Sequence, residues 1–381
     1  MIQSKLPDVG LTIFSQMSQL AQQHGALNLS QGFPDFQAPD PLIAALGRYA
    51  QAGHNQYASM AGVAPLREQL AQSIAQLYGA TLSPEQELTI TPGATQALFC
   101  AIQAIVGPGD EVIVFDPCYD SYAPAVRLAG GRTVHVPLSS DFSYDWQAFA
   151  QALSPRTRLV IINSPHNPSG ATITQEDLTQ LAQLTQEQGI YILSDEVYEH
   201  LLFDGRQHQS VLSHPQLYAR ACVVGSFGKT FHVTGWKTGY LAAPPALTAE
   251  VRKVHQYVSF CAPTPIQLAL ADFMQNHPEH IQELPAFYQV KRDQLCAALT
   301  ESRFTFSPSA STYFQLVDYR AIRDDLDDVA MARWLTEHKG IASIPLSVFY
   351  QQPPEQQFLL RLCFAKTTAT LEQAGELLCA I

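Results

Sequence analysis

A lysine-containing loop after a predicted buried strand is the feature of the sequence best suited to covalent chemistry. The strand at 221–225 is followed by SFGKT at 226–230, and a second basic residue, Lys237, follows in GWKTG. A lysine that is partly desolvated beside another cation has a lowered pKa and can attack a carbonyl as the neutral amine. A nucleotide-binding P-loop also ends in Gly-Lys-Thr, but its spacing is excluded here because position 223 is Val rather than Gly.

A carboxylate ends another predicted strand, at 190–194. Asp195 follows this strand directly, and Tyr198 comes shortly after it in SDEVYE. A carboxylate at the end of a buried strand is costly unless a cation meets it, and a protonated ring nitrogen of a ligand would serve. The alternative is that Asp195 caps a helix whose first turn carries Glu196 and Glu199. This segment alone leaves both interpretations open.

Two further strand ends carry groups that could hold an anion or a polar ligand. TPGAT at 91–95 opens an apolar helix, and the free N–H groups of such a helix start can bind phosphate. In NSPHNPSG at 163–170, two prolines hold the amide of Asn167 in place for a ligand oxygen. The alternatives are a plain helix start and a common Asn-Pro turn.

One basic residue interrupts an apolar run near the end of the chain. Arg361 lies within LLRLCFA at 359–365. A buried arginine needs an acidic partner, which is either an internal carboxylate or a carboxylate of the substrate. The sequence favours neither partner over the other.

An alternation of strands and helices must position these residues. Short runs rich in Val and Ile are separated by stretches long enough for a helix, which is typical of a mostly parallel sheet with crossover helices. The runs are continuously apolar, as in strands buried on both faces. Ligands bind at the carboxyl ends of such strands, so the loops described above should meet. The pattern predicts strands at 88–91, 111–115, 133–137, 159–163, 190–194 and 221–225, and helices at 63–77 and 95–106.

The pattern changes near residue 285, where we predict a smaller α+β domain. A helical stretch at 287–299, strand-like segments at 312–319 and 359–365, and a helix containing Trp334 occur there. About the first 40 residues show no long periodic segment and are expected to pack across the lobes. The predicted division is a large domain at 43–284, and an N-terminal segment plus small C-terminal domain at 1–42 and 285–381.

Composition and charge narrow the class of protein. Of the 381 residues 46% are hydrophobic and 15% are charged, which is ordinary for a folded globular enzyme. The net charge of −12 disfavours binding to nucleic acid or to anionic membranes. No apolar run approaches the length of a membrane helix, and the first residues lack the apolar core of a signal peptide. Seven cysteines without a C-x-x-C pattern favour a reduced, cytoplasmic protein.

In combination and in chain order, these segments resemble the class I/II aminotransferases of fold type I, which use pyridoxal 5′-phosphate (PLP). The residues of these motifs are most similar to those of the kynurenine/glutamine aminotransferase branch. The resemblance implies an α/β fold in which the domain at 43–284 binds PLP, and a homodimer with shared active sites. The matching motifs are QGFPDF, NQYASMAG, TPGATQAL, DPCYDSYAP, NSPHNPSG, SDEVYEH, SFGKTFHVTGWKTGY and RLCFAK.

The resemblance also implies a role for each cofactor-binding residue. Lys229 would form a Schiff base with PLP and then shuttle a proton, and Asp195 would keep the pyridine nitrogen protonated. Asn167 and Tyr198 would hydrogen-bond the ring's 3′-oxygen, and Tyr119 would stack on the ring. The wider superfamily usually has arginine at the position of Lys237. The phosphate here would therefore meet the compact ammonium group of a lysine instead of a planar guanidinium that can donate two parallel hydrogen bonds. The phosphate would be held by Gly93, Ala94, Thr95, Ser226, Lys237 and, in the neighbouring subunit, Tyr57.

For the substrate, the resemblance implies a clamp on the α-carboxylate by Arg361, assisted by Asn163 and the Gly32 backbone. The side chain of the substrate would meet an aromatic pocket that includes Phe33, Tyr57 and Tyr119, and also Tyr257 and Phe349. The activity implied is transfer of the amino group of methionine and aromatic amino acids to a 2-oxo acid by a ping-pong mechanism.

Two other functions would use the same cofactor. A lyase acting on cysteine S-conjugates or cystathionine would share these residues, and release of pyruvate and ammonia without an acceptor would distinguish it. A non-catalytic PLP-binding regulator would need an appended DNA-binding module, for which the chain has no residues left.

Overall fold

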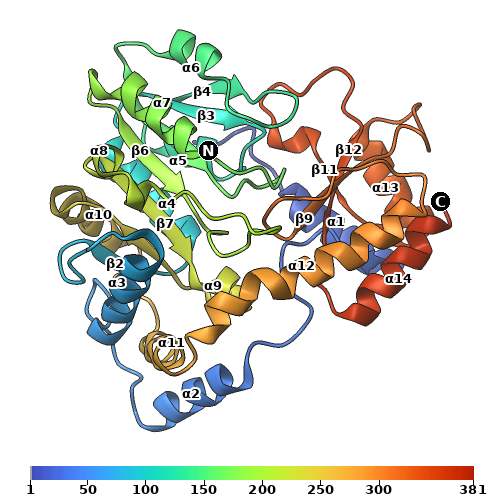
Figure 1. Ribbon diagram of the computed structural model, residues 1–381. Coiled ribbons are helices and arrows are strands. Elements are labelled where there is room, and N and C mark those ends of the chain that lie inside the picture. The colour runs from blue at the N-terminus through green and yellow to red at the C-terminus, as the bar shows by residue number, and fades with distance from the viewer. Residues whose placement is uncertain (1) are drawn as a thin grey trace.

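The larger part of the fold is a seven-stranded sheet in the order β2-β8-β7-β6-β5-β3-β4 (Figure 1). A computed structural model describes residues 2–381, so residue 1 of the predicted 1–42 segment lies outside the described residues. Strands β3 to β7 pair in parallel, whereas β8 runs antiparallel to β2 and β7. The strands are β2 (Leu88–Thr91), β3 (Glu111–Asp116), β4 (Arg132–Pro137), β5 (Thr157–Asn163), β6 (Tyr191–Asp195), β7 (Ala221–Ser226) and β8 (Gly239–Ala242).

Helices cover both faces of this sheet, which explains its continuously apolar strands. Along β5, Val160 and Ile162 belong to one buried cluster, and Leu159 and Ile161 belong to another on the opposite face. The first face is covered by α2 (Asp40–Gln51), α3 (Ala64–Tyr78), α6 (Trp146–Ala152), α7 (Gln175–Gln186), α8 (Pro215–Tyr218) and α11 (Thr264–Asn276). The second is covered by α4 (Ala94–Ile105), α5 (Tyr122–Leu128) and α10 (Pro245–Val258).

The predicted α/β class with a mostly parallel sheet is confirmed, and all six predicted strands are present to within two residues at each end. The strand β8 was not predicted. It has four residues and follows the Lys237 loop directly, so it lacks the length and the helical spacing that mark the other strands.

The smaller lobe is built on an antiparallel three-stranded sheet in the order β11-β12-β9. The short parallel pair β1–β10 lies beside it. The elements are β1 (Leu27–Asn28), α12 (Glu279–Thr300), β9 (Phe314–Asp318), α13 (Asp328–Lys339), β10 (Ile341–Ala342), β11 (Ile344–Pro345), β12 (Leu359–Cys363) and α14 (Thr368–Cys379). In the larger lobe, a short helix α9 (Phe227–Thr230) follows β7. Helix α12 runs without a break across the predicted boundary at 284/285 and leads from one lobe to the other (Figure 1). The division into domains at these residues stays a prediction.

The N-terminal segment contains a helix, α1 (Ile13–His24), so the expectation of no long periodic segment there is wrong. Thr12 caps the start of the helix by accepting from the N–H of Ser15, and Gly25 ends it in the left-handed conformation. Only Met17 and Ala21 of α1 are fully buried, which leaves a weak apolar pattern in a Gln-rich sequence. The helix packs against α13, β10 and β11 in the smaller lobe, whereas α2 packs against α11.

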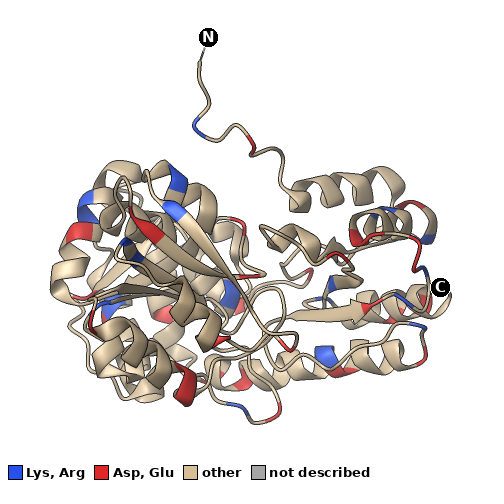
Figure 2. Cartoon of the chain, turned by 90° about the horizontal axis from the view of Figure 1, so that it is seen from above, with Lys and Arg blue, Asp and Glu red and all other residues tan. Residues whose placement is uncertain are grey.

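Charged residues are dispersed over the molecule. Figure 2 shows Lys and Arg spread over both lobes and interspersed with Asp and Glu. Within residues 2–381, no helix has both the length and the apolar character needed to cross a membrane.

Candidate active site

The predicted site residues converge on a cavity of about 310 Å³ between the carboxyl edge of the large sheet and the smaller lobe. The ends of β5, β6 and β7, the start of α4, the N-terminal segment and β12 all contribute to its walls. Thirteen of the predicted residues line it: Gly32, Gly93, Ala94, Thr95, Tyr119, Asn163, Asn167, Asp195, Tyr198, Ser226, Lys229, Lys237 and Arg361.

The remaining predicted residues are not among those that line this cavity. The carbonyl of Phe33 accepts from Lys366 Nζ at 3.0 Å, and its side chain is exposed. Tyr57 is 85% exposed and packs edge-on against Phe260. Tyr257 is also exposed, whereas Phe349 is buried with its ring 5.2 Å from the Arg361 guanidinium.

Lys229 is placed by the short helix α9, which begins directly after β7. Its Nζ donates to the carbonyl of Gly32 at 3.0 Å and to the hydroxyl of Tyr313 at 2.5 Å. Burial lowers the pKa of this amine to about 8, and the nearby cations Arg361 and Lys237 act in the same direction. A tenth of such an amine is neutral at about pH 7, which suits it to act as a nucleophile.

Asp195 is buried at the last position of β6. Its Oδ2 accepts from the hydroxyl of Tyr122 at 2.6 Å, and Oδ1 accepts weakly from the Val197 N–H at 3.4 Å. Burial raises the pKa of this carboxyl to about 6, against the lowering effect of the Tyr122 hydrogen bond. The residues that follow form turns and no helix, so the interpretation of Asp195 as a helix cap is wrong.

Arg361 lies in the middle strand of the small sheet and is 1% exposed. Its Nη1 donates to Asn167 Oδ1 at 2.6 Å, and Nη2 donates to the Ser30 carbonyl at 3.2 Å. The guanidinium lies 3.8 Å from the ring centre of Phe314, and its Nε has no partner among residues 2–381. No acidic side chain of residues 2–381 forms the internal salt bridge that the sequence left open, and the group keeps capacity for an anion.

The start of α4 forms an anion-binding cradle. Gly93 precedes the helix with a φ of 82°, and no side chain caps the first turn, so the N–H groups of Ala94 and Thr95 remain available. A Cβ on Gly93 would lie 3.3 Å from Lys237 Cε, which shows how closely the lysine approaches this turn. Ser226, at the end of β7, lines the same cavity.

Two tyrosines that contact the central groups, Tyr122 and Tyr313, were not predicted from the sequence. Tyr122 lies in the motif DPCYDSYAP together with Tyr119, and Tyr313 lies in the predicted strand at 312–319. A buried tyrosine usually donates a hydrogen bond from its hydroxyl, and this tendency is the only signal that the sequence carried at these two positions.

These groups fit PLP. The uncapped helix start and Lys237 suit a phosphate, the buried carboxylate of Asp195 suits a protonated ring nitrogen, and the amine of Lys229 suits an aldehyde. All of these groups line the same cavity.

A mostly parallel sheet that brings a lysine, a carboxylate and an open helix start to one edge defines a PLP-dependent transferase of fold type I. The chain belongs to the class I and II aminotransferases, whose family model matches residues 25–378. It is thus a PLP-dependent aminotransferase.

Individual relatives are similar over nearly the whole chain. The methionine aminotransferase of Escherichia coli is 54% identical over 98% of this chain and 97% of its own length. A probable N-succinyldiaminopimelate aminotransferase of Mycobacterium tuberculosis is 37% identical, with 97% and 96% covered. The mouse kynurenine–oxoglutarate transaminase 1 is 33% identical, with 96% and 94% covered.

Solved structures agree with this grouping. A structure from Escherichia coli, reported to have a methionine aminotransferase function, superposes with a TM-score of 0.97 at 53% identity and full coverage of both chains. A Thermus thermophilus aspartate aminotransferase mutant superposes with a TM-score of 0.90 at 30% identity, with 100% of this chain and 99% of that chain covered.

Proposed function

We propose that this aminotransferase takes the amino group of methionine and of aromatic amino acids and passes it to a 2-oxo acid in a ping-pong reaction. The observation that carries the proposal is the convergence of Lys229, Asp195 and Arg361 on one cavity. The 54% identity to the Escherichia coli methionine aminotransferase supports methionine as a donor.

The charges of the cavity favour a substrate with a neutral side chain. Lys229, Lys237 and Arg361 are the cations that line it within residues 2–381. They would serve the amine chemistry, the phosphate and the α-carboxylate, so none of them remains for a second carboxylate. The apolar lining residues that a bulky side chain could contact are Phe14, Leu98, Tyr119 and Phe314.

The substrate carboxylate would bind to Arg361, with Asn163 and the Gly32 backbone beside it. The fork of Arg361 already has Asn167 and Ser30 as partners, which hold the group in place for an incoming anion. Asn163 is itself fixed, because its Nδ2 donates to the Asp195 carbonyl at 2.8 Å and its Oδ1 accepts from the Asn167 N–H at 2.9 Å.

The proton transfers would depend on Lys229 and Asp195. Bound PLP withdraws electrons from the substrate's α-carbon and so makes its proton acidic. The neutral Lys229 amine would hold the cofactor by condensing with its aldehyde, whose oxygen leaves as water. Once the substrate amine takes its place, the freed Lys229 amine would move the proton between the substrate's α-carbon and the cofactor's C4′. The Asp195 carboxylate, held by Tyr122, would keep the ring nitrogen protonated.

The other predicted residues would hold the cofactor. Tyr119 would stack on the ring, and Asn167 and Tyr198 would donate to or accept from the 3′-oxygen. The phosphate would lie on Gly93, Ala94, Thr95, Ser226 and Lys237. We include a homodimer in the proposal, with Tyr57 reaching the phosphate of the neighbouring subunit, because exposed Tyr57 lies outside its own cavity. The free state of all seven cysteines supports a reduced, cytoplasmic setting.

The absorption spectrum of the purified protein tests the reaction directly. We expect a yellow protein that bleaches on addition of methionine alone and regains its colour with a 2-oxo acid. The Lys229→Ala variant should fail to complete this cycle. A protein that gains no visible band with added PLP would overturn the proposal. Pyruvate and ammonia formed from a cysteine S-conjugate without any acceptor, in the absence of that cycle, would instead identify a lyase.

A further inference from the structure

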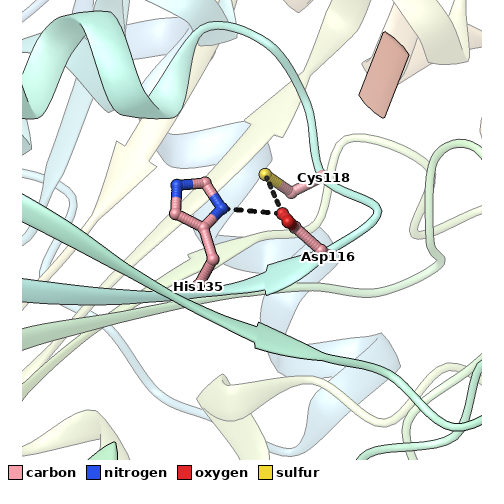
Figure 3. Close-up of side chains that lie close together, drawn as sticks. All are labelled: Asp116, Cys118 and His135. Atoms are coloured by element: carbon pink, nitrogen blue, oxygen red, sulfur yellow. Dashed lines mark hydrogen bonds and ion pairs between the residues drawn. The ribbon is translucent and has the colours of Figure 1, made fainter. Parts of the chain in front are cut away.

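Three metal-ligand side chains converge at the end of β3, outside the walls of the cavity. Asp116 is the last residue of β3, Cys118 follows in the next loop, and His135 lies on the neighbouring strand β4 (Figure 3). A carboxylate oxygen, the thiol sulfur and an imidazole nitrogen all lie within 4.8 Å of one another. Asp116 and Cys118 are buried, and the His135 side chain is largely so.

Two of the three side chains are already oriented by outer partners. Asp116 Oδ2 accepts from the backbone N–H of Gln351 at 2.8 Å, which leaves Oδ1 facing the other two side chains. His135 Nε2 lies 3.1 Å from Thr133 Oγ1, so its Nδ1 is the nitrogen directed at Asp116. Outer partners of this kind fix the ring and the carboxylate of metal ligands.

Both ligand pairs that include Asp116 Oδ1 can be compared with the spacing of a tetrahedral metal site. Cys118 Sγ lies 3.4 Å from Asp116 Oδ1, and His135 Nδ1 lies 2.8 Å from the same oxygen. Ligands at zinc distances from a tetrahedral centre lie roughly 3.3–3.7 Å apart. The sulfur–oxygen pair already meets this spacing, and the nitrogen–oxygen pair would have to open by about 0.5 Å.

A hollow beside the cluster gives a route for an ion and room for water. It has a volume of about 630 Å³, and Asp116 and His135 lie in its wall. Arg132 also lines this hollow, but its charge is directed at Glu111, which it meets at 2.7 Å. An ion entering here would therefore meet Asp116 and His135 first, with the buried Cys118 thiol behind them.

We propose that Asp116, Cys118 and His135 bind a divalent transition metal of the zinc class, with a water molecule from the hollow as the fourth ligand. One thiolate and one carboxylate would neutralise the ion, which suits a buried site, and sulfur with nitrogen selects zinc over magnesium or calcium. On binding, the Cys118 thiol proton leaves to solvent, and the His135 proton resides on Nε2, facing Thr133 Oγ1.

The site would join the two lobes beside the cavity. The Cys118 N–H donates to the Phe349 carbonyl at 2.7 Å, and Asp116 holds the N–H of Gln351 in the same segment of the smaller lobe. Tyr119, next to Cys118, lines the cavity. A metal here would fix the loop of Tyr119 against the smaller lobe, and the bound ion would stabilise the holoenzyme against unfolding.

Cobalt titration of the holoenzyme tests this site. We expect Co²⁺ alone, added to the PLP-loaded protein without amino acid, to produce visible d–d bands at longer wavelength than the cofactor absorbs, saturating at one ion per chain. Added Zn²⁺ should bleach these bands and raise the thermal midpoint of the holoenzyme.

Matched variants locate the ligands. Cys118→Ser and His135→Gln should each lose the bands while keeping the cofactor spectrum, which reports a folded protein. Cys379→Ala removes an exposed thiol elsewhere in the chain and should leave the titration unchanged. If Cys118→Ser does not fold, His135→Gln decides alone. Absence of the bands in the wild type, or their persistence in a folded ligand variant, would mean that the three side chains form only a hydrogen-bonded cluster.

Discussion

Burial sets the ionisation of Lys229, and this gives a pH dependence that can be measured on the apoenzyme. The amine is neutral above its pKa and protonated below it, and only the neutral form bonds to an aldehyde. Because burial lowers the pKa to about 8, we expect the rate of covalent PLP uptake to rise about tenfold from pH 6 to 7 and to level off above about pH 8. Stopped-flow absorbance would record it. A rate that still rises steeply at about pH 10 would show a lysine with an ordinary pKa.

Tyr122 acts on the same chemistry through Asp195. Its hydroxyl donates a hydrogen bond to this carboxylate, which lowers the pKa of the carboxyl. Burial has the larger, opposite effect, and the resulting pKa is about 6. Activity that needs ionised Asp195 is lost as the pH falls through its pKa, so Tyr122→Phe should move the acidic limb of kcat/KM for methionine upward by about one pH unit. A uniform loss of activity with an unmoved limb would indicate a packing role only.

Arg361 should contribute mainly to substrate binding. Arg361→Ala removes a buried fork for the α-carboxylate, which we expect to lower kcat/KM on the order of 100-fold, or about 3 kcal/mol, chiefly through KM. Arg361→Lys keeps the positive charge but loses the two-pronged guanidinium, so its kcat/KM should lie between those of the wild type and Arg361→Ala. Steady-state kinetics with methionine would measure both variants, and an unchanged apparent affinity in Arg361→Ala would rule out this role.

The residues that could be predicted from sequence are those whose local setting is unusual. Asp195 and Lys229 follow buried strands, and Arg361 interrupts an apolar run, so each is conspicuous within a few positions. Tyr122 and Tyr313 gain their roles from partners 73 and 84 residues away along the chain. Such contacts exist only after the sheet and both lobes have assembled.

At the scale of elements, strands buried on both faces were the easiest to predict. Their continuous Val and Ile runs reflect the helices on either side of the sheet. The short strand β8 and the weakly amphipathic helix α1 lack such runs, because β8 is stabilised by pairing with β2 and β7 and α1 by two buried residues. Tertiary contacts, more than local pattern, determine these elements.

The close approach of β8 to the start of α4 should be needed for the phosphate cradle. A Cβ on Gly239 would lie 2.7 Å from the Ala94 nitrogen, so Gly239→Ala should displace the N–H groups that we propose as phosphate ligands. Overpacking typically costs about 1–3 kcal/mol, so we expect the affinity for PLP to fall by about 10-fold or more. Gly235→Ala is the matched control, since a Cβ there meets nothing within 4 Å. Titration of the apoenzymes with PLP would measure both, and equal affinities would contradict the argument.

At the scale of the whole molecule, the cavity depends on both lobes and on the N-terminal segment. The large sheet supplies the groups suited to the cofactor, the small sheet supplies Arg361, and the N-terminal segment supplies Gly32, whose carbonyl accepts from both Lys229 and Tyr313. Relative movement of the lobes would therefore change the distance between Arg361 and Lys229. Because the lining residues come from both lobes and from the N-terminal segment, no single stretch of the sequence was enough to predict the site.

The proposed dimer predicts that two inactive variants restore activity when their subunits mix. Tyr57 is 85% exposed, beside Phe260 and outside its own cavity, which suits it to complete a neighbouring site. In a hybrid of Tyr57→Ala and Lys229→Ala subunits, one site would contain an intact Lys229 and the partner's intact Tyr57. Random exchange of equal amounts should then yield about a quarter of the wild-type activity per chain, since half of the dimers are hybrids with one working site. If Tyr57 served its own subunit, or if the chain acted as a monomer, mixing would restore nothing above the sum of the two variants.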